Sequence, residues 1–245
     1  MTPRIQPIAA GLTLLIPAQS DPERNAVAEA FKEAGGTVLP LDRFWEPPAL
    51  EPSSVRIYGP DTFCLVLQQK LGLMLNSPAD DLLLRLPKEL LGRTLRSSPL
   101  AGLDGVIYPA FVKPVIPKQF RAGVFPSHES LRTEAQGLPA HTRVLISEVV
   151  NFTAEVRAFV LGGKVLDASI YEGGNSEILL ARRTAESAAQ AVSLPVALVA
   201  DVGYIENRGW AVIEFNAAWG AGLNGCDARK VLPVIVRASS AGRLQ

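Results

Sequence analysis

The sequence is poor in cysteine and histidine and carries no excess of charge, and each shortage excludes a class of protein. Its 245 residues include two cysteines, Cys64 and Cys226, and two isolated histidines, so we expect neither a disulfide scaffold nor a zinc site. Lys plus Arg and Asp plus Glu both number 24, which disfavours a broad basic surface for nucleic acid. So few cysteines are typical of a reducing compartment, and we expect a cytoplasmic protein.

Long hydrophobic runs are also missing, although 48% of the residues are hydrophobic and predict a sizeable core. No apolar run approaches the roughly 20 residues that a membrane span needs. The apolar stretch 8–16 has only Arg4 as a nearby positive charge and is followed by Pro17, so it predicts a buried first strand rather than a signal peptide. We therefore expect no membrane partner.

Several catalytic signatures are absent as well. The chain has no G-x-S-x-G elbow and no Walker-type lysine loop. The segment 220–225 matches G-x-G-x-x-G after a strand, but no second strand with an acidic residue follows about 20 positions later. We therefore interpret it as a glycine-rich turn before the last helix, not as a dinucleotide site.

The first 80 residues alternate between short apolar runs and segments with helical spacing, which predicts a parallel α/β unit. Expected strands are 12–16, 38–39, 55–58 and 73–75, and expected helices follow the Ser20-x-x-Glu23 capping spacing and cover 61–71.

Beyond residue 80 the pattern favours helices and hairpins, an α+β arrangement. A helix broken at Pro87 is expected within 80–100, and the clearest helix is 176–192. Expected strands are 106–113 and 142–150, with hairpins at Gly162-Gly163 and 206–209 and an aperiodic loop over 114–140.

Polar residues at strand ends are the first candidates for chemistry. Glu214 and Asn216 share one strand face, and a hairpin could bring Asp201 beside them, giving three oxygen ligands that suit Mg²⁺. The alternative is a solvated strand end. Lys113, also at a strand end, could neutralise a phosphate, or it could be an ordinary surface lysine.

Three further segments have competing interpretations. Glu148-Val149-Val150 could present hydrogen-bonding groups to a base edge in an apolar slot. The loop after the Lys113 strand carries Lys118 and Arg121 and could close over a polyphosphate, or it could be an ordinary surface connection. Glu155 and Arg157 share a strand face and could simply pair with each other.

The order of these segments resembles the ATP-grasp superfamily, most of all its glutamate-ligase and glutathione-synthetase type. The motifs that carry the likeness are Lys113-Pro114, Ser147-Glu148-Val149-Val150, Glu155-Val156-Arg157, Gly162-Gly163-Lys164-Val165, Asp201 and Glu214-Phe215-Asn216. The resemblance covers about residues 75–225. It implies a pre-ATP-grasp α/β domain over 1–80, then two α+β subdomains, 81–145 and 146–245, that sandwich the nucleotide.

The resemblance also implies a role for each matching residue. ATP binding falls to Lys113, Glu148, Val149, Val150 and Glu155, with Lys88, or failing that Arg93, in place of an earlier lysine. Arg157, Lys118 and Arg121 are the implied catalytic residues, and Asp201, Glu214 and Asn216 the implied Mg²⁺ ligands. The implied reaction activates a carboxylate as an acyl-phosphate and joins it to an amine or similar acceptor.

One departure from the family keeps other functions open. The usual glycine- and serine-rich loop after the Lys113 strand is replaced by 115–124, as in a smaller set of bacterial and phage-type members. This change favours, as an alternative, a catalytically silent module that binds nucleotide or a partner. A ligase acting on a nucleic-acid end is a further alternative, because Arg85, Lys88, Arg93 and Arg96 could line one helix side.

Overall fold

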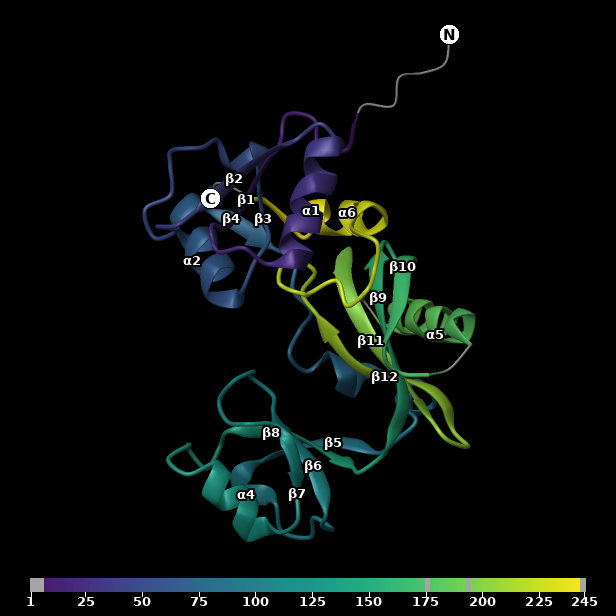
Figure 1. Ribbon diagram of the computed structural model, residues 1–245. Helices are drawn as coiled ribbons and strands as arrows, with labels where there is room; N and C mark the ends of the chain where they lie inside the picture. The colour runs from purple at the N-terminus through teal and green to yellow at the C-terminus, as the bar shows by residue number, and fades with distance from the viewer. Residues whose placement is uncertain (1–6, 175–176, 193–194, 243–245) are drawn as a thin grey trace.

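The computed structural model describes residues 7–174, 177–192 and 195–242, which form three regions (Figure 1). A parallel α/β unit lies at one end, a small antiparallel sheet lies at the other, and a larger antiparallel sheet lies between them. The expected combination of α/β and α+β structure is therefore confirmed. Among the described residues, no helix is both long enough and apolar enough to cross a membrane.

The N-terminal unit is built on three parallel strands in the order β2-β1-β3. Its strands are β1 (Thr13–Pro17), β2 (Thr37–Leu41) and β3 (Val55–Ile57), and its helices are α1 (Pro22–Glu33), α2 (Asp61–Leu71) and a 3-10 turn at Pro52–Ser54. Helix α1 is capped by Asp21, whose side chain accepts from the Arg24 amide at 2.9 Å, rather than by the expected Ser20. The carboxylate of Asp21 satisfies an otherwise unpaired amide of the first turn.

The small sheet has the order β5-β8-β6-β7 and differs most from the sequence-based expectation. Its elements are 3-10 turns at Leu82–Arg85 and Leu100–Gly102, α3 (Lys88–Leu91), β5 (Leu95–Pro99), β6 (Ala110–Pro114), β7 (Gly123–Phe125), α4 (His128–Glu134) and β8 (Arg143–Glu148). The expected helix over 80–100 is wrong at its end, because β5 pairs there with β8. The expected strand at 106 begins only at Ala110, and the expected loop 114–140 contains β7 and α4.

The large sheet has the order β10-β9-β11-β12, and all its pairs are antiparallel. Its elements are β9 (Phe152–Leu161), β10 (Lys164–Gly173), α5 (Ile178–Ala191), β11 (Ala197–Ile205) and β12 (Gly209–Asn216). Both expected hairpins are confirmed, and Gly162 and Gly163 have the positive φ angles that the first one requires. The expected start of α5 at Ser176 lies outside the described residues.

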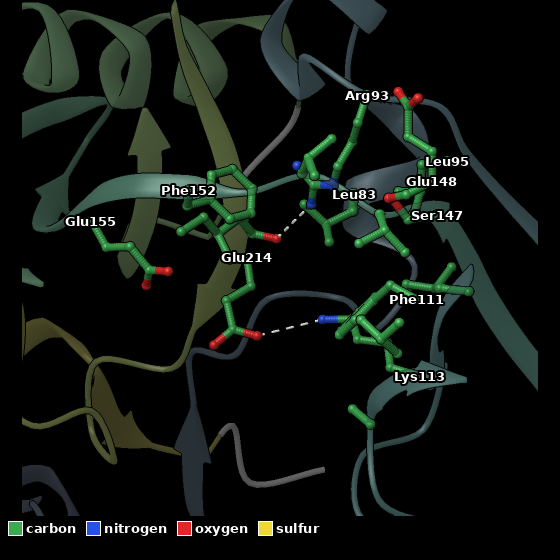
Figure 2. A pocket seen from close by; sticks show the side chains of 16 residues that line it. Leu83, Arg93, Leu95, Phe111, Lys113, Ser147, Glu148, Phe152, Glu155 and Glu214 are labelled. Atoms are coloured by element: carbon green, nitrogen blue, oxygen red, sulfur yellow. Dashed lines mark hydrogen bonds and ion pairs between the residues drawn. The ribbon is translucent and has the colours of Figure 1, made fainter. Parts of the chain in front are cut away.

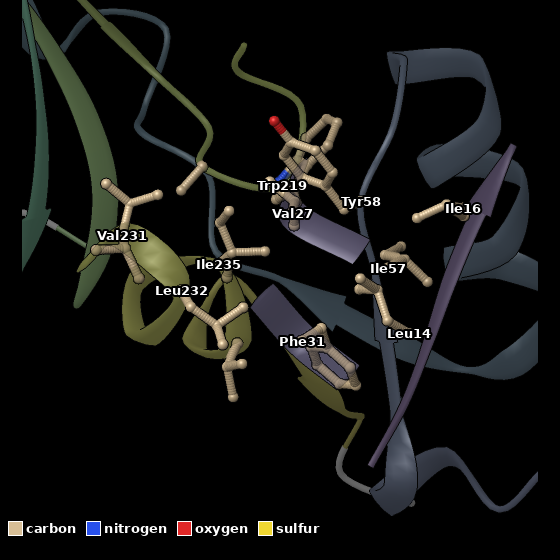
Figure 3. Packing of buried hydrophobic residues seen from close by; sticks show 14 of the residues in the cluster. Leu14, Ile16, Val27, Phe31, Ile57, Tyr58, Trp219, Val231, Leu232 and Ile235 are labelled. Carbon is tan, nitrogen blue, oxygen red and sulfur yellow. The ribbon is translucent and has the colours of Figure 1, made fainter. Parts of the chain in front are cut away.

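The end of the chain returns to the N-terminal unit. Helix α6 (Ala228–Arg237) follows the glycine-rich turn, as expected, and buries Val231, Leu232 and Ile235 against Phe31 and other residues of the first unit (Figure 3). Strand β13 (Ser239–Ala241) pairs antiparallel with β4 (Leu73–Leu75), so β4 does not join the parallel sheet as expected. We call this cluster, which α1, β1, β3 and α6 build together, the shared core.

Candidate functional site

A cavity of about 340 Å³ lies between the small sheet and the large sheet (Figure 2). Leu95, Phe111 and Lys113 form the wall on the small sheet, and Phe152 and Glu214 belong to the wall on the large sheet. The walls are mainly apolar and charged groups gather at one end, an arrangement typical of sites for partly polar ligands.

The connection between the two sheets closes the cavity on one side. Strand β8 ends at Glu148 and β9 begins at Phe152, so Val149 and Val150 cross from one sheet to the other and line the cavity. The Glu148 carboxylate accepts hydrogen bonds from the Thr94 amide at 2.9 Å and from Arg208 Nη1 at 2.8 Å. These two contacts, the amide first, hold the pKa of Glu148 below its usual range.

At the charged end, Lys113 and Glu214 meet across the cavity. Lys113 Nζ, on β6, lies 3.4 Å from Glu214 Oε2, on β12 (Figure 2). Glu155, on β9, also lines the cavity, and its carboxylate accepts from the Tyr171 hydroxyl at 2.5 Å. Burial and this hydrogen bond raise the pKa of Tyr171. Glu155 therefore pairs with Tyr171, and the simple Glu155–Arg157 ion pair considered from the sequence does not form.

The three expected metal ligands lie together on one face of the large sheet. Asp201 is directly opposite Glu214 in the β11–β12 register, despite a bulge after it. The Asn216 amide nitrogen lies 3.0 Å from Asp201 Oδ2 and 3.2 Å from Glu214 Oε1. Among the described residues, no group of three or more His, Cys, Asp or Glu side chains could hold a metal. The set therefore consists of two carboxylates and one amide, whose oxygens are hard donors suited to Mg²⁺.

Arg157 is the cation of this face. Its Nε and Nη2 donate to the two oxygens of Asp201 at 2.9 and 2.7 Å, and its Nη1 donates to the Gly222 carbonyl at 3.0 Å. Burial raises the pKa of Asp201, and the hydrogen bonds from Arg157 offset part of this rise. Burial alone lowers the pKa of Arg157, but Asp201 outweighs it and the net shift is upward. The pair is a bidentate ion pair with little exposure to solvent.

Three of the expected site residues do not line this cavity. Lys88 instead lines a neighbouring cavity of about 450 Å³ beside α3. Lys118 Nζ forms an ion pair with Asp61 at the start of α2, and Arg121 contacts Glu134 through its backbone amide. The expected closure of these two side chains over the cavity is not seen in this structure, and from the loop between β6 and β7 the cavity receives Ala122.

Arg93 lines both cavities and has a larger structural role than the sequence indicated. Its guanidinium donates to the carbonyls of Leu91, Val212 and Ile213 at 3.0, 2.7 and 3.1 Å and lies over the Phe152 ring. Burial lowers its pKa. The sequence offered it only as a substitute for Lys88, and no local signal indicates carbonyl partners almost 120 residues away.

Comparison with known proteins places this geometry in context. The model of an ATP-grasp domain family, the second family of its clade, matches residues 90–234, more than half of the chain. A search of curated proteins finds no match.

Solved structures of low sequence identity share the fold. A RimK domain ATP-grasp protein from Sphaerobacter thermophilus has a TM-score of 0.63 at 15% identity, covering 91% of this chain and 99% of its own. D-alanine–D-alanine ligase from Bacillus anthracis has a TM-score of 0.58 at 12% identity, covering 93% and 97%. The D-cycloserine synthetase DcsG has a TM-score of 0.59 at 15% identity, covering 92% and 98%.

Proposed function

The chain belongs to the ATP-grasp domain family that its residues 90–234 match, and on this premise we propose that it is a Mg²⁺- and ATP-dependent ligase. In this proposal it activates a carboxylate as an acyl-phosphate and joins it to an amine or similar acceptor. The observation that carries the proposal is the cavity itself, which is apolar along its walls and ends where Lys113 faces Glu214.

We place the base of ATP in the apolar part of the cavity and its phosphates at the charged end. The backbone of Val149 and Val150 offers hydrogen-bonding groups beside Phe111 and Phe152, which suits a flat aromatic base. Lys113 then supplies a positive charge for the phosphates, and Glu155 lies at the intermediate position expected for the ribose. Arg93 already satisfies three carbonyls, so its role here is to support the wall.

Asp201, Glu214 and Asn216 are the residues that would hold Mg²⁺. Their oxygens converge on one face, and Lys113 and Arg157 balance the two negative charges in the structure. When bound, Mg²⁺ neutralises phosphate charge and orients the transferred group. Arg157 remains beside Asp201, where its charge can stabilise the negative oxygens that develop during transfer.

The proposed reaction has two balanced steps. A substrate carboxylate oxygen attacks the γ-phosphorus of ATP, the bond to the β-phosphate oxygen breaks, and ADP leaves with that electron pair. The acceptor amine then attacks the acyl carbon, gives up a proton, and inorganic phosphate leaves. Both steps rely on positioning and on charge neutralisation by the residues above.

A second candidate, a nucleotide-binding module without ligase activity, is favoured by one observation. Lys118 and Arg121, the expected catalytic residues of the loop, do not line the cavity, and Lys118 is paired with Asp61. In the ligase, this loop would have to exchange its contact with Asp61 for a contact with substrate. ADP release that requires a carboxylate and an acceptor would distinguish the ligase from the module.

Titration of ATP, with and without Mg²⁺, tests the proposed site. ATP at 100 times its dissociation constant should stabilise the wild-type fold by about 2.7 kcal/mol. We expect Lys113→Met and Glu214→Gln to weaken Mg²⁺-dependent binding at least about tenfold, because each removes a charge at the phosphate end. Lys164→Met is the matched control, since Lys164 is exposed and pairs with Glu186 away from the cavity. Binding that survives both site variants would contradict the placement of ATP.

A further inference from the structure

The glycine-rich turn 220–225 between β12 and α6 is held by the N-terminal unit. The Tyr58 hydroxyl donates to the Ala221 carbonyl at 2.7 Å. The Glu23 carboxylate, in the first turn of α1, accepts from the Leu223 amide at 2.9 Å and from the Asn224 amide at 2.7 Å. One acidic side chain therefore satisfies two successive backbone amides about 200 residues away in sequence.

The backbone of the turn is shaped for this close approach. A Cβ atom added at Gly222 would lie 2.5 Å from Glu23 Oε2, so a larger residue there would push the carboxylate away. Asn224 and Gly225 have φ angles of 46° and 84°, in the left-handed region that turns the chain toward α6. The local sequence and the Glu23 contact are therefore matched to each other.

The same turn also holds Arg157. The Gly222 carbonyl, next to the amides that Glu23 binds, accepts from Arg157 Nη1 at 3.0 Å. The two oxygens of Asp201 accept from the other side of the guanidinium. Acceptors on two separate segments thus fix the plane of the guanidinium, and Asp201 is in turn bound by Asn216.

We propose that Glu23 is a positioning residue for the phosphate end of the site. By holding the amides of residues 223 and 224 it fixes the Gly222 carbonyl, and that carbonyl fixes the orientation of Arg157. This inference rests on the proposed function in one respect, that Arg157 faces the phosphates. It makes the N-terminal unit part of the catalytic apparatus without any direct contact to the nucleotide.

A contact that merely joins the same elements provides the matched control. Glu33, at the other end of α1, binds Arg229 of α6 through two hydrogen bonds of 2.6 and 2.8 Å. It links α1 to the segment after β12, as Glu23 does, but it touches neither the turn nor Arg157. If Glu23 only joins the two regions, Glu23→Gln and Glu33→Gln should behave alike.

The first measurement follows the Arg157 side chain directly. In protein labelled with ¹⁵N-arginine, the Arg157 Nε–H signal is identified by its loss in Arg157→Lys. We expect Glu23→Gln to speed solvent exchange of this proton about tenfold, because the amide side chain presents a donor to the turn's donors. Glu33→Gln should leave the exchange rate at the wild-type value. Equal rates in the wild type and Glu23→Gln would overturn the proposal.

The second measurement separates the phosphate end from the base. We expect Glu23→Gln and Gly222→Ala each to weaken binding of ATP with Mg²⁺ about tenfold and to leave adenosine binding unchanged. The double variant should lose no more than either single variant, because both break the same contact. Equal losses for ATP and adenosine would mean general disruption and would overturn the proposal.

The outcomes for the two proposals remain distinct. If wild-type protein binds no ATP, the proposed function fails, whereas the exchange rates still decide whether Glu23 orders Arg157. If Glu23→Gln does not fold, Gly222→Ala displaces the same carboxylate from the other side, and its Arg157 exchange rate decides instead.

Discussion

The two sides of the cavity are held by different kinds of contact. On the side of the β8–β9 connection, Arg93 donates to three backbone carbonyls, and Arg208 donates to the Gly92 carbonyl and to Glu148. On the open side, Lys113 reaches Glu214 through one contact of 3.4 Å, and Lys118 meets Asp61 on the surface. The first side is joined by directional hydrogen bonds and the second by single ion pairs.

This difference indicates where the two sheets can move. Hydrogen bonds from a half-buried guanidinium to fixed carbonyls tolerate little displacement, whereas ion pairs of flexible lysines weaken with salt and distance. We therefore expect the sheets to pivot at Arg93 and Arg208 and to open at Lys113. Such an opening would admit a nucleotide to the cavity.

Removing Arg93 should have the largest effect on stability. Arg93→Met would leave the carbonyls of Leu91, Val212 and Ile213 without their donor, and we expect it to lower the free energy of unfolding by about 3 kcal/mol. Denaturant unfolding measures the change. Arg85→Met is the control, because Arg85 makes only an exposed pair with Asp81. Equal losses in the two variants would contradict a special role for Arg93.

Removing Arg208 should cost less and should depend on pH. Arg208→Ala is expected to cost about 1 kcal/mol at neutral pH. The folded-state pKa of Glu148 is lowered, so its contribution is present above the unfolded-state pKa of about 4.3 and is lost as pH falls through the folded value. The difference between wild type and Arg208→Ala should therefore shrink at acid pH. A difference that stays constant down to about pH 2 would argue against the Glu148 contact as its source.

Removing Lys118 should change stability least. Its pair with Asp61 is exposed, so Lys118→Gln should alter the free energy of unfolding by no more than about 0.5 kcal/mol. Molar salt should reduce even this difference, whereas the cost of Arg93→Met should persist. Unfolding curves at low and high salt make the comparison. A large, salt-resistant cost for Lys118→Gln would show that the open side is held as firmly as the other.

The sequence predicted best where the signals were local. Glycines at 162 and 163 predicted the β9–β10 hairpin, and the i, i+2 spacing placed Glu214 and Asn216 on one face. Asp201 could be placed beside them because a short hairpin sets the register across it.

The sequence predicted least where the partner is distant. The polar strand Leu95–Pro99 has no strand periodicity, and it forms because β8, almost 50 residues later, pairs with it. Helix α4 was missed because its capping box uses Ser130 at the position where glutamate is the usual signal. The Arg157–Asp201 pair crosses strands, whereas the expected partner Glu155 lies on the same strand.

The return of α6 and β13 to the first unit has a consequence for synthesis on the ribosome. Parallel strands β1, β2 and β3 emerge early, yet the side chains that complete the shared core, among them Val231 and Ile235, are translated almost last. Nascent N-terminal units usually fold as they leave the ribosome. Here the apolar surface under α6 must wait uncovered while the rest of the chain is made, so the interval between translation of residue 80 and residue 241 is when this protein is most exposed to chaperones and to aggregation.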